Sequence, residues 1–462
     1  MSETAAGSEV PQRHLFGTDG VRGIANTELS PSLVMALGAA AAQVLRESST
    51  SREIVVGRDP RISGDLLQAA LVAGIASQGM NVVLLGVLPT PGVAYLTQAR
   101  NAAAGVMISA SHNPVEDNGI KFFGANGRKL SDALEARIEA AMQNWETVER
   151  PCGGEVGRVR EVPEAVQEYA DHLAETMRPR QLDGLRLIVD GANGAAAYLA
   201  PVVLGGLGAE VVPVSCYPNG VNINAECGSL HPEDMARRVV AEEAFAGMAF
   251  DGDADRVILA DNQGRIFDGD RILYAAGVWL HRQGELPGST VVGTIMSNMG
   301  LEVALQKQGV RLVRAAVGDR YVAEQMREHG AVLGGEKSGH ILFSRYSTTG
   351  DGILTALQIL RLCCESGRSL AEWSDEVEEY PQELLSVRVR DRNAWKTNER
   401  VQQAIQQAEQ QLGDRGRINV RPSGTEKKVR VMVEGPERDE VAQLARSVAD
   451  VIAAELGPEA AG

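Results

Sequence analysis

Three carboxylates at alternate positions are the most distinctive chemical feature of this sequence. They lie in segment 251–256, between an apolar stretch at 248–250 and a strand predicted at 257–260. On an extended loop all three can point to one side, where only a cation relieves their mutual repulsion. Oxygen ligands alone favour a hard ion such as Mg²⁺. The predicted metal ligands are Asp251, Asp253 and Asp255.

This segment has two other interpretations. An EF-hand calcium loop needs Gly at its sixth position and Glu at its twelfth, where the chain has Arg256 and Asn262. Calcium sensing is therefore excluded. A solvated acidic turn is the plainer alternative, and it predicts no bound ion.

A serine at the end of a small-residue strand is the second candidate. The strand predicted from residue 103 runs into Ser109-Ala-Ser-His-Asn-Pro114, where Pro biases the residue before it toward extended backbone. A rigid turn would hold the Ser111 oxygen in place, and a covalent intermediate divides one difficult transfer into two easier ones. Lys121 or His112 could supply an acid or base. The alternative is a turn serine that bonds only its own backbone.

Two further loops carry groups suited to a phosphorylated sugar. In Arg421-Pro-Ser-Gly-Thr-Glu426 the guanidinium, the hydroxyls and the backbone N–H groups can converge on one phosphate, although a tight turn between strands is the alternative. In segment 334–340, Glu336 and Ser338 could bind ring hydroxyls. This second loop is not a Walker A motif, because Glu336 precedes the lysine where Gly is required. No G-x-G-x-x-G fingerprint is present either, so the sequence does not support a nucleotide as ligand.

Size and charge narrow the classes of partner. The chain has 462 residues, too many for one hydrophobic core. Its formal net charge is −16 and no block of Lys and Arg offsets it, so no nucleic-acid partner is expected. A few Arg and Lys within a cleft can still attract a small anionic substrate.

Targeting segments and cysteines add little chemistry. Residues 1–13 predict no signal peptide, and no apolar run approaches the roughly 20 residues that cross a bilayer, so we expect a cytoplasmic protein with no membrane partner. The five cysteines are odd in number and lack a C-x-x-C pair, which fits neither a disulfide framework nor a zinc site. His172 and His281 lie in helical patterns and receive no role.

Short β-branched runs alternate with helical patterns, which predicts βαβ units around mainly parallel sheets. Three segments are alike, each a strand running into a polar loop: 53–59, 185–194 and 289–298. A linker is predicted at 145–160 and another change near 379–382. The last part combines strands at 386–390 and 429–433 with a helix that opens at Pro436, typical of a small α+β domain. The predicted domains are 1–160, 161–268, 269–383 and 384–462.

Together the motifs resemble the α-D-phosphohexomutase family over nearly the whole chain and in the expected order. The similar segments are the opening loop 15–23, the phosphoserine loop 109–114, the metal loop 251–256, the sugar loop 335–340 and the phosphate loop 421–426. The resemblance implies an α/β fold of three tandem similar domains with mixed sheets, and a smaller C-terminal α+β domain, around a central cleft.

The resemblance also implies a role for each matching residue. Ser111 would carry the phosphoryl group and join the three aspartates around one Mg²⁺. Arg22 and Lys121 would polarise the transferred group and assist proton movement, and His340 would orient or deprotonate the sugar. The residues implied in substrate binding are Gly335, Glu336, Ser338, Arg421, Ser423, Gly424 and Thr425.

Within the family, segments 16–23, 222–229 and 231–233 favour members that convert glucosamine 6-phosphate to glucosamine 1-phosphate, as does Ser-Gly-Thr-Glu at 423–426. That reaction would use glucosamine 1,6-bisphosphate as intermediate and activator, and would supply UDP-N-acetylglucosamine and cell-wall synthesis. Lys427 departs from the Pro that many members carry there, which bears on the rigidity of the phosphate loop.

Three alternatives stay open after the resemblance. A phosphoglucomutase or phosphomannomutase would perform the same chemistry on neutral hexose phosphates. A phosphatase would let water take the phosphoryl group, and a sugar-phosphate sensor would keep the fold without catalysis. The small-molecule partner is a sugar phosphate in each case, and a homodimer is left open.

Overall fold

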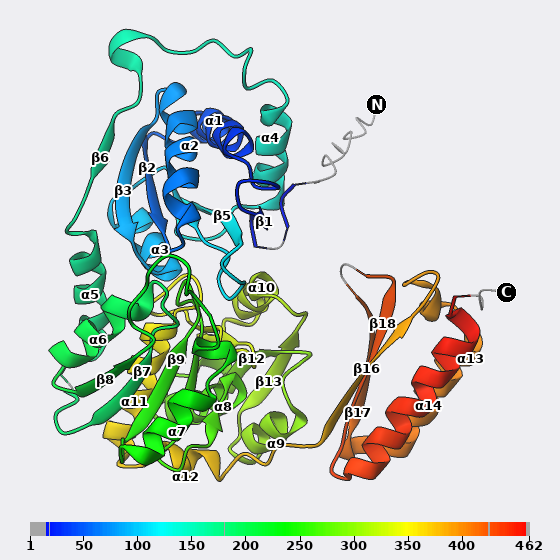
Figure 1. The fold of residues 1–462 in the computed structure, drawn as a ribbon. Coiled ribbons are helices and arrows are strands. Elements are labelled where there is room, and N and C mark those ends of the chain that lie inside the picture. Colours follow the sequence, from blue (N-terminus) through cyan, green and yellow to red (C-terminus); the bar gives the residue numbers. More distant parts are fainter. Residues whose placement is uncertain (1–14, 18, 180, 424–425, 459–462) are drawn as a thin grey trace, which may run out of the picture.

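The chain folds around four β-sheets in the computed structural model, which describes residues 15–17, 19–179, 181–423 and 426–458 (Figure 1). The first sheet has the strand order β1-β5-β4-β2-β3-β6. Its strands are β1 (Val21–Ile24), β2 (Glu53–Arg58), β3 (Asn81–Val87), β4 (Ala104–Ile108), β5 (Asp117–Gly124) and β6 (Val159–Glu161). Its helices are α1 (Pro31–Ser48), α2 (Ser63–Ser77), α3 (Thr90–Ala99) and α4 (Asp132–Met142).

The second and third sheets follow in sequence. The second, in the order β11-β10-β9-β7-β8, comprises β7 (Arg186–Asp190), β8 (Glu210–Val214), β9 (Ala246–Phe250), β10 (Val257–Ala260) and β11 (Ile266–Phe267), with α5 (Ala165–Glu175), α6 (Ala196–Gly206) and α7 (Glu233–Ala241). The third, in the order β13-β12-β14-β15, comprises β12 (Thr290–Thr294), β13 (Arg311–Ala315), β14 (Leu333–Gly335) and β15 (Ile341–Phe343). Its helices are α8 (Gly269–Arg282), α9 (Met299–Lys307), α10 (Asp319–His329), α11 (Gly352–Ser366) and α12 (Leu370–Ser374).

One four-strand arrangement recurs in all three sheets. Three parallel strands are followed by an antiparallel fourth, giving the orders β5-β4-β2-β3, β10-β9-β7-β8 and β15-β14-β12-β13. The segments that look alike in the sequence contain the first strand of each arrangement, β2, β7 and β12. The predicted fold class of tandem similar α/β domains with mixed sheets is thereby confirmed.

The recurring arrangement places the three predicted chemical loops at equivalent positions. The third and fourth strands form a hairpin in each domain, and its connection is the serine loop between β4 and β5, the acidic loop between β9 and β10, or the sugar loop between β14 and β15. The third strands β4, β9 and β14 are buried at every residue, as expected for strands covered on both faces. The three loops therefore start from rigid strands.

The C-terminal unit, residues 382–458, has its own sheet in the order β16-β18-β17. It comprises β16 (Gln382–Arg388), β17 (Arg417–Pro422) and β18 (Lys428–Glu434), covered by α13 (Glu399–Leu412) and α14 (Arg438–Leu456). The last helix begins at Arg438, two residues beyond the predicted opening at Pro436, because Glu437 is still extended.

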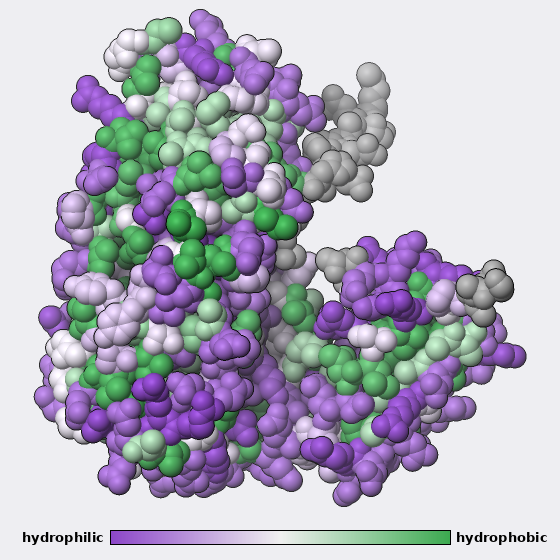
Figure 2. Space-filling view, in the orientation of Figure 1, coloured by the Kyte–Doolittle hydropathy of each residue, from purple (hydrophilic) through white to green (hydrophobic). Residues whose placement is uncertain are grey.

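The hydrophobic cores follow the same division. The largest buried apolar cluster runs from Val55 to Val377 through the first three domains, whereas the C-terminal unit has a separate cluster from Val389 to Leu456. Figure 2 shows the surface hollowed between the β1 side of the first domain and the C-terminal unit. Among the described residues, no helix is long and apolar enough to cross a membrane.

The segment predicted as a linker, 145–160, passes over the end of the first domain between α4 and β6 and includes a short 3-10 helix at Gly153–Glu155 (Figure 1). It nevertheless ends in β6, whose residues pair in parallel with β3. Sequence alone gave no sign of this strand, because its three residues are all exposed and carry no apolar alternation.

Candidate active site

Ser111 lies at the start of the turn after β4 and faces the acidic loop. Its backbone has φ of 52°, the left-handed region that a non-glycine residue adopts at some cost. The side chain is buried, and Oγ donates a hydrogen bond of 2.5 Å to Oδ2 of Asp251. His112 Nδ1 lies 3.2 Å from the same oxygen. The predicted pairing of the serine with the metal loop is thus present in the geometry.

A fully buried arginine holds the serine turn in this unusual conformation. Arg61 donates from Nη2 to the carbonyl oxygens of Ser111 and Asn113, both at 2.9 Å, and from Nε to Asp59 Oδ2 at 2.9 Å. Asn224 Nδ2 donates to the same two carbonyls at 2.9 and 3.0 Å. Four hydrogen bonds to two carbonyls fix the turn from both the first and second domains.

These supporting residues were missed by the sequence interpretation. Asp59 ended one of the three similar segments, and Asn224 lay in a segment used only to recognise the family. Neither carries a sign of its partner, since Asp59 accepts from Ser109, 50 positions away, and Asn224 donates to Ser111, 113 positions away. The signal in the sequence was a polar loop directly after a buried strand.

The acidic loop brings its three carboxylates together as the spacing predicts. One oxygen from each of Asp251, Asp253 and Asp255 lies within 4.8 Å of the others, and all three residues are buried. The loop is a tight turn with Ala254 at φ 56°, not the extended segment assumed from the sequence. Alternate residues converge because the left-handed residue reverses the chain.

Two of these buried carboxylate oxygens have no hydrogen-bond partner. Neither Asp253 Oδ1 nor Asp255 Oδ1 accepts a hydrogen bond within the described structure, although Asp255 Oδ1 lies 3.6 Å from His340 Nδ1. A buried carboxylate oxygen without a hydrogen-bond donor is costly. Burial raises the pKa of Asp251 well above its ordinary range, and the charges of Asp255 and Asp253 add to this. A divalent cation would satisfy the free oxygens and offset the repulsion, so the donor set fits Mg²⁺.

Glycine permits the serine and acidic loops to touch. A Cβ on Gly252 would lie 2.4 Å from the carbonyl oxygen of Ser111, closer than any real contact. The glycine between the first two aspartates is therefore required for the two loops to meet.

Lys121 on β5 is buried against the acidic cluster. Its Nζ lies 2.7 Å from Asp253 Oδ2, 3.2 Å from Asp19 Oδ2 and 3.8 Å from Asp255 Oδ2. Burial acts to lower the pKa of Lys121, but these carboxylates outweigh it and hold the pKa above its ordinary value. The lysine is therefore a fixed cation. Thr90, which sequence reasoning did not single out, donates to Asp253 at 2.6 Å.

Arg22 and His340 come from the first and third domains. Arg22 is on β1 and makes a close ion pair with Asp19, which also pairs with Lys121. His340 lies with Nδ1 3.6 Å from Asp255 Oδ1 and Nε2 3.8 Å from Asp319 Oδ2. Burial acts against the charged form of His340, yet Asp255 and Asp319 raise its pKa to about 9.

His112 differs from His340 in charge. Burial, followed by the charges of Arg256 and Arg22, lowers the pKa of His112 to about 4. The imidazole beside the serine is therefore neutral at pH 7, whereas the buried lysine is charged. Between the two acid–base candidates left open by the sequence, only His112 is deprotonated in this arrangement.

The sugar loop lies against the metal loop. Gly335 ends β14 and is buried, Ser338 is exposed, and Glu336 accepts a hydrogen bond of 2.9 Å from the backbone N–H of Gly318. Gly339 has φ of 90°, and a Cβ there would lie 2.2 Å from the carbonyl oxygen of Val257. The structure thus brings the loops of the second and third domains together and leaves Ser338 open to a ligand.

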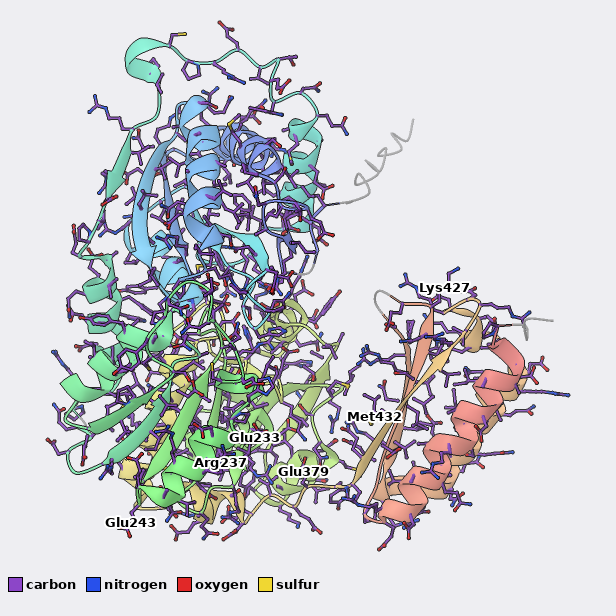
Figure 3. All side chains as sticks on the ribbon, in the orientation of Figure 1. Glu233, Arg237, Glu243, Glu379, Lys427 and Met432 are labelled. Carbon is purple, nitrogen blue, oxygen red and sulfur yellow. The ribbon has the colours of Figure 1, made fainter. Side chains whose placement is uncertain are left out.

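The phosphate loop stands apart from this centre. Arg421 lies on β17 and donates from Nη2 to Met296 Sδ at 3.6 Å, while the backbone N–H of Ser423 donates to Lys428 at 2.8 Å. Gly424 and Thr425 lie outside the described residues. Lys427 lies at the tip of the C-terminal unit (Figure 3), and no interaction between the described part of this loop and the acidic cluster is recorded.

Family models and known proteins match most of the chain. Family models of phosphoglucomutase/phosphomannomutase match in order: α/β/α domain I at residues 13–149, domain II at 167–264, domain III at 268–380 and the C-terminal domain at 384–451. A phosphoglucosamine mutase of Desulforudis audaxviator is 55% identical over 421 residues, which cover 91% of this chain and 93% of that protein. Another, of Desulforamulus reducens, is 51% identical over 439 residues, covering 95% and 99%.

Solved structures share the fold at lower identity. A phosphoglucomutase/phosphomannomutase family protein of Burkholderia thailandensis superposes with a TM-score of 0.80 at 23% identity, covering 95% of this chain and 97% of that one. An N-acetylphosphoglucosamine mutase of Aspergillus fumigatus, in complex with GlcNAc-6P and magnesium, has a TM-score of 0.66 at 19% identity, with 96% of each chain covered. These likenesses extend over all four sheets.

Proposed function

The chain belongs to the phosphoglucomutase/phosphomannomutase family, and we propose that it interconverts glucosamine 6-phosphate and glucosamine 1-phosphate. The carrying observation is the hydrogen bond of 2.5 Å between Ser111 Oγ and the buried acidic cluster. A serine oxygen beside three carboxylates is suited to phosphoryl transfer only when a cation compensates the charge. Phosphoglucosamine mutases at 55% and 51% identity support the substrate class.

Mg²⁺ would be held by Asp251, Asp253, Asp255 and the group on Ser111, and would neutralise charge spread over the transferring phosphoryl oxygens. The chain supplies the rest. Lys121 keeps its proton near the carboxylates, and Arg22 adds a second cation through Asp19. We propose that these two groups polarise the phosphoryl group and that His340 orients the sugar hydroxyl. A pKa of about 9 leaves His340 protonated at pH 7, so it does not serve as the acceptor of the hydroxyl proton.

The proposed first step moves the phosphoryl group from Ser111 to the sugar. The C1 hydroxyl oxygen of glucosamine 6-phosphate attacks phosphorus, and a C1 oxygen to phosphorus bond forms as the bond to Ser111 Oγ breaks. The hydroxyl proton passes to a base beside the sugar, and the leaving serine oxygen takes a proton. The product is glucosamine 1,6-bisphosphate, which also serves as activator.

In the second step the bisphosphate turns over in the cleft and Ser111 Oγ attacks the phosphorus on the C6 oxygen. The bond from phosphorus to Oγ forms as the bond to the C6 oxygen breaks; the serine gives up the proton gained in the first step and the C6 oxygen takes one. The sugar leaves as the 1-phosphate and no phosphate is consumed. The phosphate loop must then hold phosphate at either end of the sugar, so Arg421, Ser423, Gly424 and Thr425 would recognise charge. Recognition of the ring falls to Gly335, Glu336 and Ser338.

Relative turnover of three substrates tests the proposed specificity. Glucosamine 6-phosphate should be converted in strong preference to glucose 6-phosphate and mannose 6-phosphate, with product identified by NMR. A preference for a neutral hexose would replace the proposal with the second candidate, a phosphoglucomutase or phosphomannomutase, which the family description supports. Free phosphate accumulating without any 1-phosphate would instead indicate a phosphatase.

Ser111→Ala tests the covalent route. Turnover should fall below detection while binding of glucosamine 6-phosphate is largely kept, because only the phosphoryl carrier is removed. Phosphatase treatment should lower the intact mass of the wild-type protein but not that of this variant. The exposed Ser32 on α1 provides the control, and Ser32→Ala should behave as wild type. Substantial residual mutase activity in Ser111→Ala contradicts the route.

The proposal includes a setting for the enzyme. We place the domain divisions at 160/161, 268/269 and 383/384, although β6 and β16 cross two of them by one and two residues. A cytoplasmic location is proposed, in keeping with five free cysteines. The product would supply UDP-N-acetylglucosamine and cell-wall synthesis, and a homodimer is left open.

A further inference from the structure

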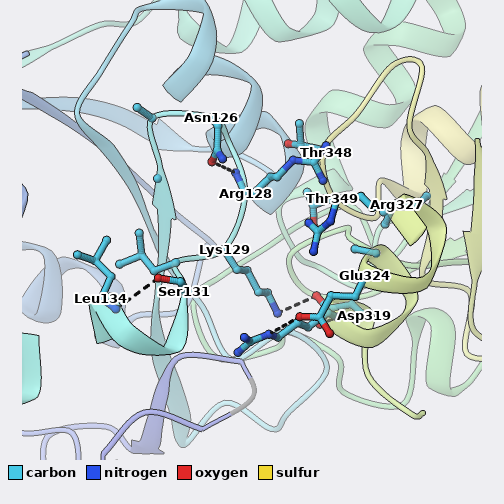
Figure 4. Close-up of a pocket in the computed structure, with 16 residues that line it drawn as sticks. Asn126, Arg128, Lys129, Ser131, Leu134, Asp319, Glu324, Arg327, Thr348 and Thr349 are labelled. Carbon is cyan, nitrogen blue, oxygen red and sulfur yellow. Dashed lines mark hydrogen bonds and ion pairs between the residues drawn. The ribbon is translucent and has the colours of Figure 1, made fainter. Parts of the chain in front are cut away.

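A cavity of about 590 Å³ opens between the first and third domains, beside the catalytic centre (Figure 4). One wall is the turn after β5 and the start of α4. The opposite wall is α10 and the turn at 348–349. This volume lies within the range of small-molecule sites in proteins. None of the predicted substrate residues that the structure describes lines it.

Two guanidinium groups enter this cavity without a partner. Arg128 and Arg327 both line it, and in Figure 4 their side chains extend toward one another from opposite walls. Within the described residues, no ion pair or side-chain hydrogen bond is recorded for either guanidinium. Like charges that converge are unfavourable unless an anion lies between them. The arrangement therefore lacks a negative group.

Other hydrogen-bond donors face the same space. Thr349 is a buried residue, and its hydroxyl makes no hydrogen bond among the described residues. Asn126 uses only its amide oxygen, which accepts from the Arg128 backbone N–H at 3.1 Å. Both therefore keep donors for a ligand. Guanidinium forks combined with neutral donors are the groups that bind phosphoryl oxygens.

The remaining charges of the cavity are already satisfied. Lys129 bridges Asp19 at 2.6 Å and Asp319 at 2.7 Å, and Arg320 pairs with Asp132 and with Glu324. The surplus positive charge thus resides on the two arginines, in a chain whose formal net charge is −16.

An anion bound across the cavity would add to existing contacts between the first and third domains, which we call the seam. Thr348 Oγ1 donates to the carbonyl oxygen of Gly127 at 2.6 Å, and Lys129 joins the two domains through Asp319. Because Asp19 and Asp319 each also contact a predicted catalytic group, the seam forms a partition between the cavity and the catalytic centre.

We propose that this cavity is a second anion site, separate from the substrate site, that binds the phosphoryl group of a phosphate monoester between Arg128 and Arg327. The anion neutralises the two guanidinium groups, accepts from Thr349 and Asn126, and ties the first domain to the third. The site does not depend on which sugar phosphate is the substrate.

Equilibrium dialysis with radiolabelled inorganic phosphate, and separately with glucosamine 6-phosphate, tests this site. Arg421→Gln weakens the proposed substrate cradle, so binding that persists in this variant reports the second site. In the Arg421→Gln background, adding Arg327→Gln or Arg128→Gln should lower that remaining affinity at least tenfold. Whether the monoester or only free phosphate shows this loss identifies the source of the phosphoryl group.

The matched control removes a positive charge elsewhere. Arg237 is exposed on α7 (Figure 3), and Arg237→Gln should leave binding unchanged. Arg327 is also exposed, so Arg327→Gln should fold and turn over saturating glucosamine 6-phosphate within twofold of wild type. Phosphate and monoester binding by Arg128→Gln/Arg327→Gln that superimposes on that of wild type overturns the proposal, as does a tenfold loss in Arg237→Gln.

Discussion

The catalytic junction and the phosphate loop use the same kind of hairpin connection but are built differently. Three hairpin loops meet at the junction, where Ser111, the acidic cluster and Lys121 are buried and bonded across domains. The phosphate loop joins β17 and β18 in a unit with its own core. One region has its partners in place, whereas the other faces the hollow seen in Figure 2.

The connection between these regions is narrow and polar. Asn298 exchanges hydrogen bonds with the backbone of Tyr380, at 3.0 and 2.9 Å, where the chain leaves the third domain. Arg417 donates to the Ser297 carbonyl at 2.7 Å and to buried Glu434 at 2.6 Å. The proposed reacting groups are therefore preorganised, whereas the proposed grip on the second phosphate depends on a unit attached through a few side chains.

The largest expected effect comes from breaking the junction itself. Asp253→Asn should lower kcat by roughly a thousandfold or more, because it removes a metal oxygen and the partner of Lys121 at once. Steady-state kinetics across a magnesium titration would measure this. The exposed Asp439→Asn on α14 is the control. Full recovery at high magnesium would contradict a role for Asp253 beyond affinity for the ion.

The support beneath Ser111 should matter nearly as much. Arg61→Lys keeps the buried charge beside Asp59 but loses the fork that reaches two carbonyls, so the serine turn relaxes. A misplaced nucleophile costs up to about a hundredfold in rate, and kcat should fall by that order while KM changes little. Arg46→Lys, on α1 and distant in sequence from the turn, is the comparison. An unchanged kcat would show that Asn224 suffices.

The opposite pattern is expected at the phosphate loop. Arg421→Gln removes one charged hydrogen-bond donor, worth about 1.5–3 kcal/mol, so KM should rise roughly 10- to 100-fold with a much smaller change in kcat. Kinetics on glucosamine 6-phosphate would separate the two terms. Arg415→Gln, on the same unit, should match wild type. A loss confined to kcat would place Arg421 with the junction and remove the contrast.

The sequence predicted the junction better than its surroundings. Spacing alone was sufficient for the three aspartates, since carboxylates two residues apart converge in either an extended segment or the observed turn. The Ser111 loop followed from a buried strand ending in Ser-His-Asn-Pro. What could not be predicted are cross-domain contacts such as Arg61 to Ser111 and Thr90 to Asp253, because residues far apart in the chain meet only after folding.

The recurrence of one topology explains why the predicted sites came together. Each chemical loop follows the third strand of its domain, and weak similarity among the first strands was the only sign of this in the sequence. The same reasoning did not extend to β6, which pairs at an edge without an apolar pattern. It also left Gly424 and Thr425 as predictions, since they lie outside the described residues.

The smallest expected effect concerns the free energy of unfolding that is lost at neutral pH because the carboxyl group of Asp351 is buried beside the junction. Asp351 caps α11 through Leu354 N–H at 2.9 Å and accepts from the Tyr169 hydroxyl at 2.6 Å, next to the acidic loop, where Gly352 N–H donates to Ala254. Burial raises the pKa of Asp351 to about 6, against the effect of these hydrogen bonds. The folded protein therefore binds more protons than the unfolded chain between about pH 4 and pH 6, and stability falls as pH rises through this window.

The side chain in Asp351→Asn cannot ionise but keeps an oxygen that caps the helix. This variant should therefore not lose stability as pH rises from about 4 to about 6. A difference of about two pKa units corresponds to about 3 kcal/mol, of which weaker hydrogen bonds would cancel part. The variant should therefore melt above wild type at pH 7 and nearer to it at pH 4.5, measured by thermal unfolding with Asp439→Asn as control. An equal Tm difference at both pH values would show that ionisation of Asp351 does not destabilise the protein. Burial of charged groups at the junction would then cost no more than burial in the C-terminal unit.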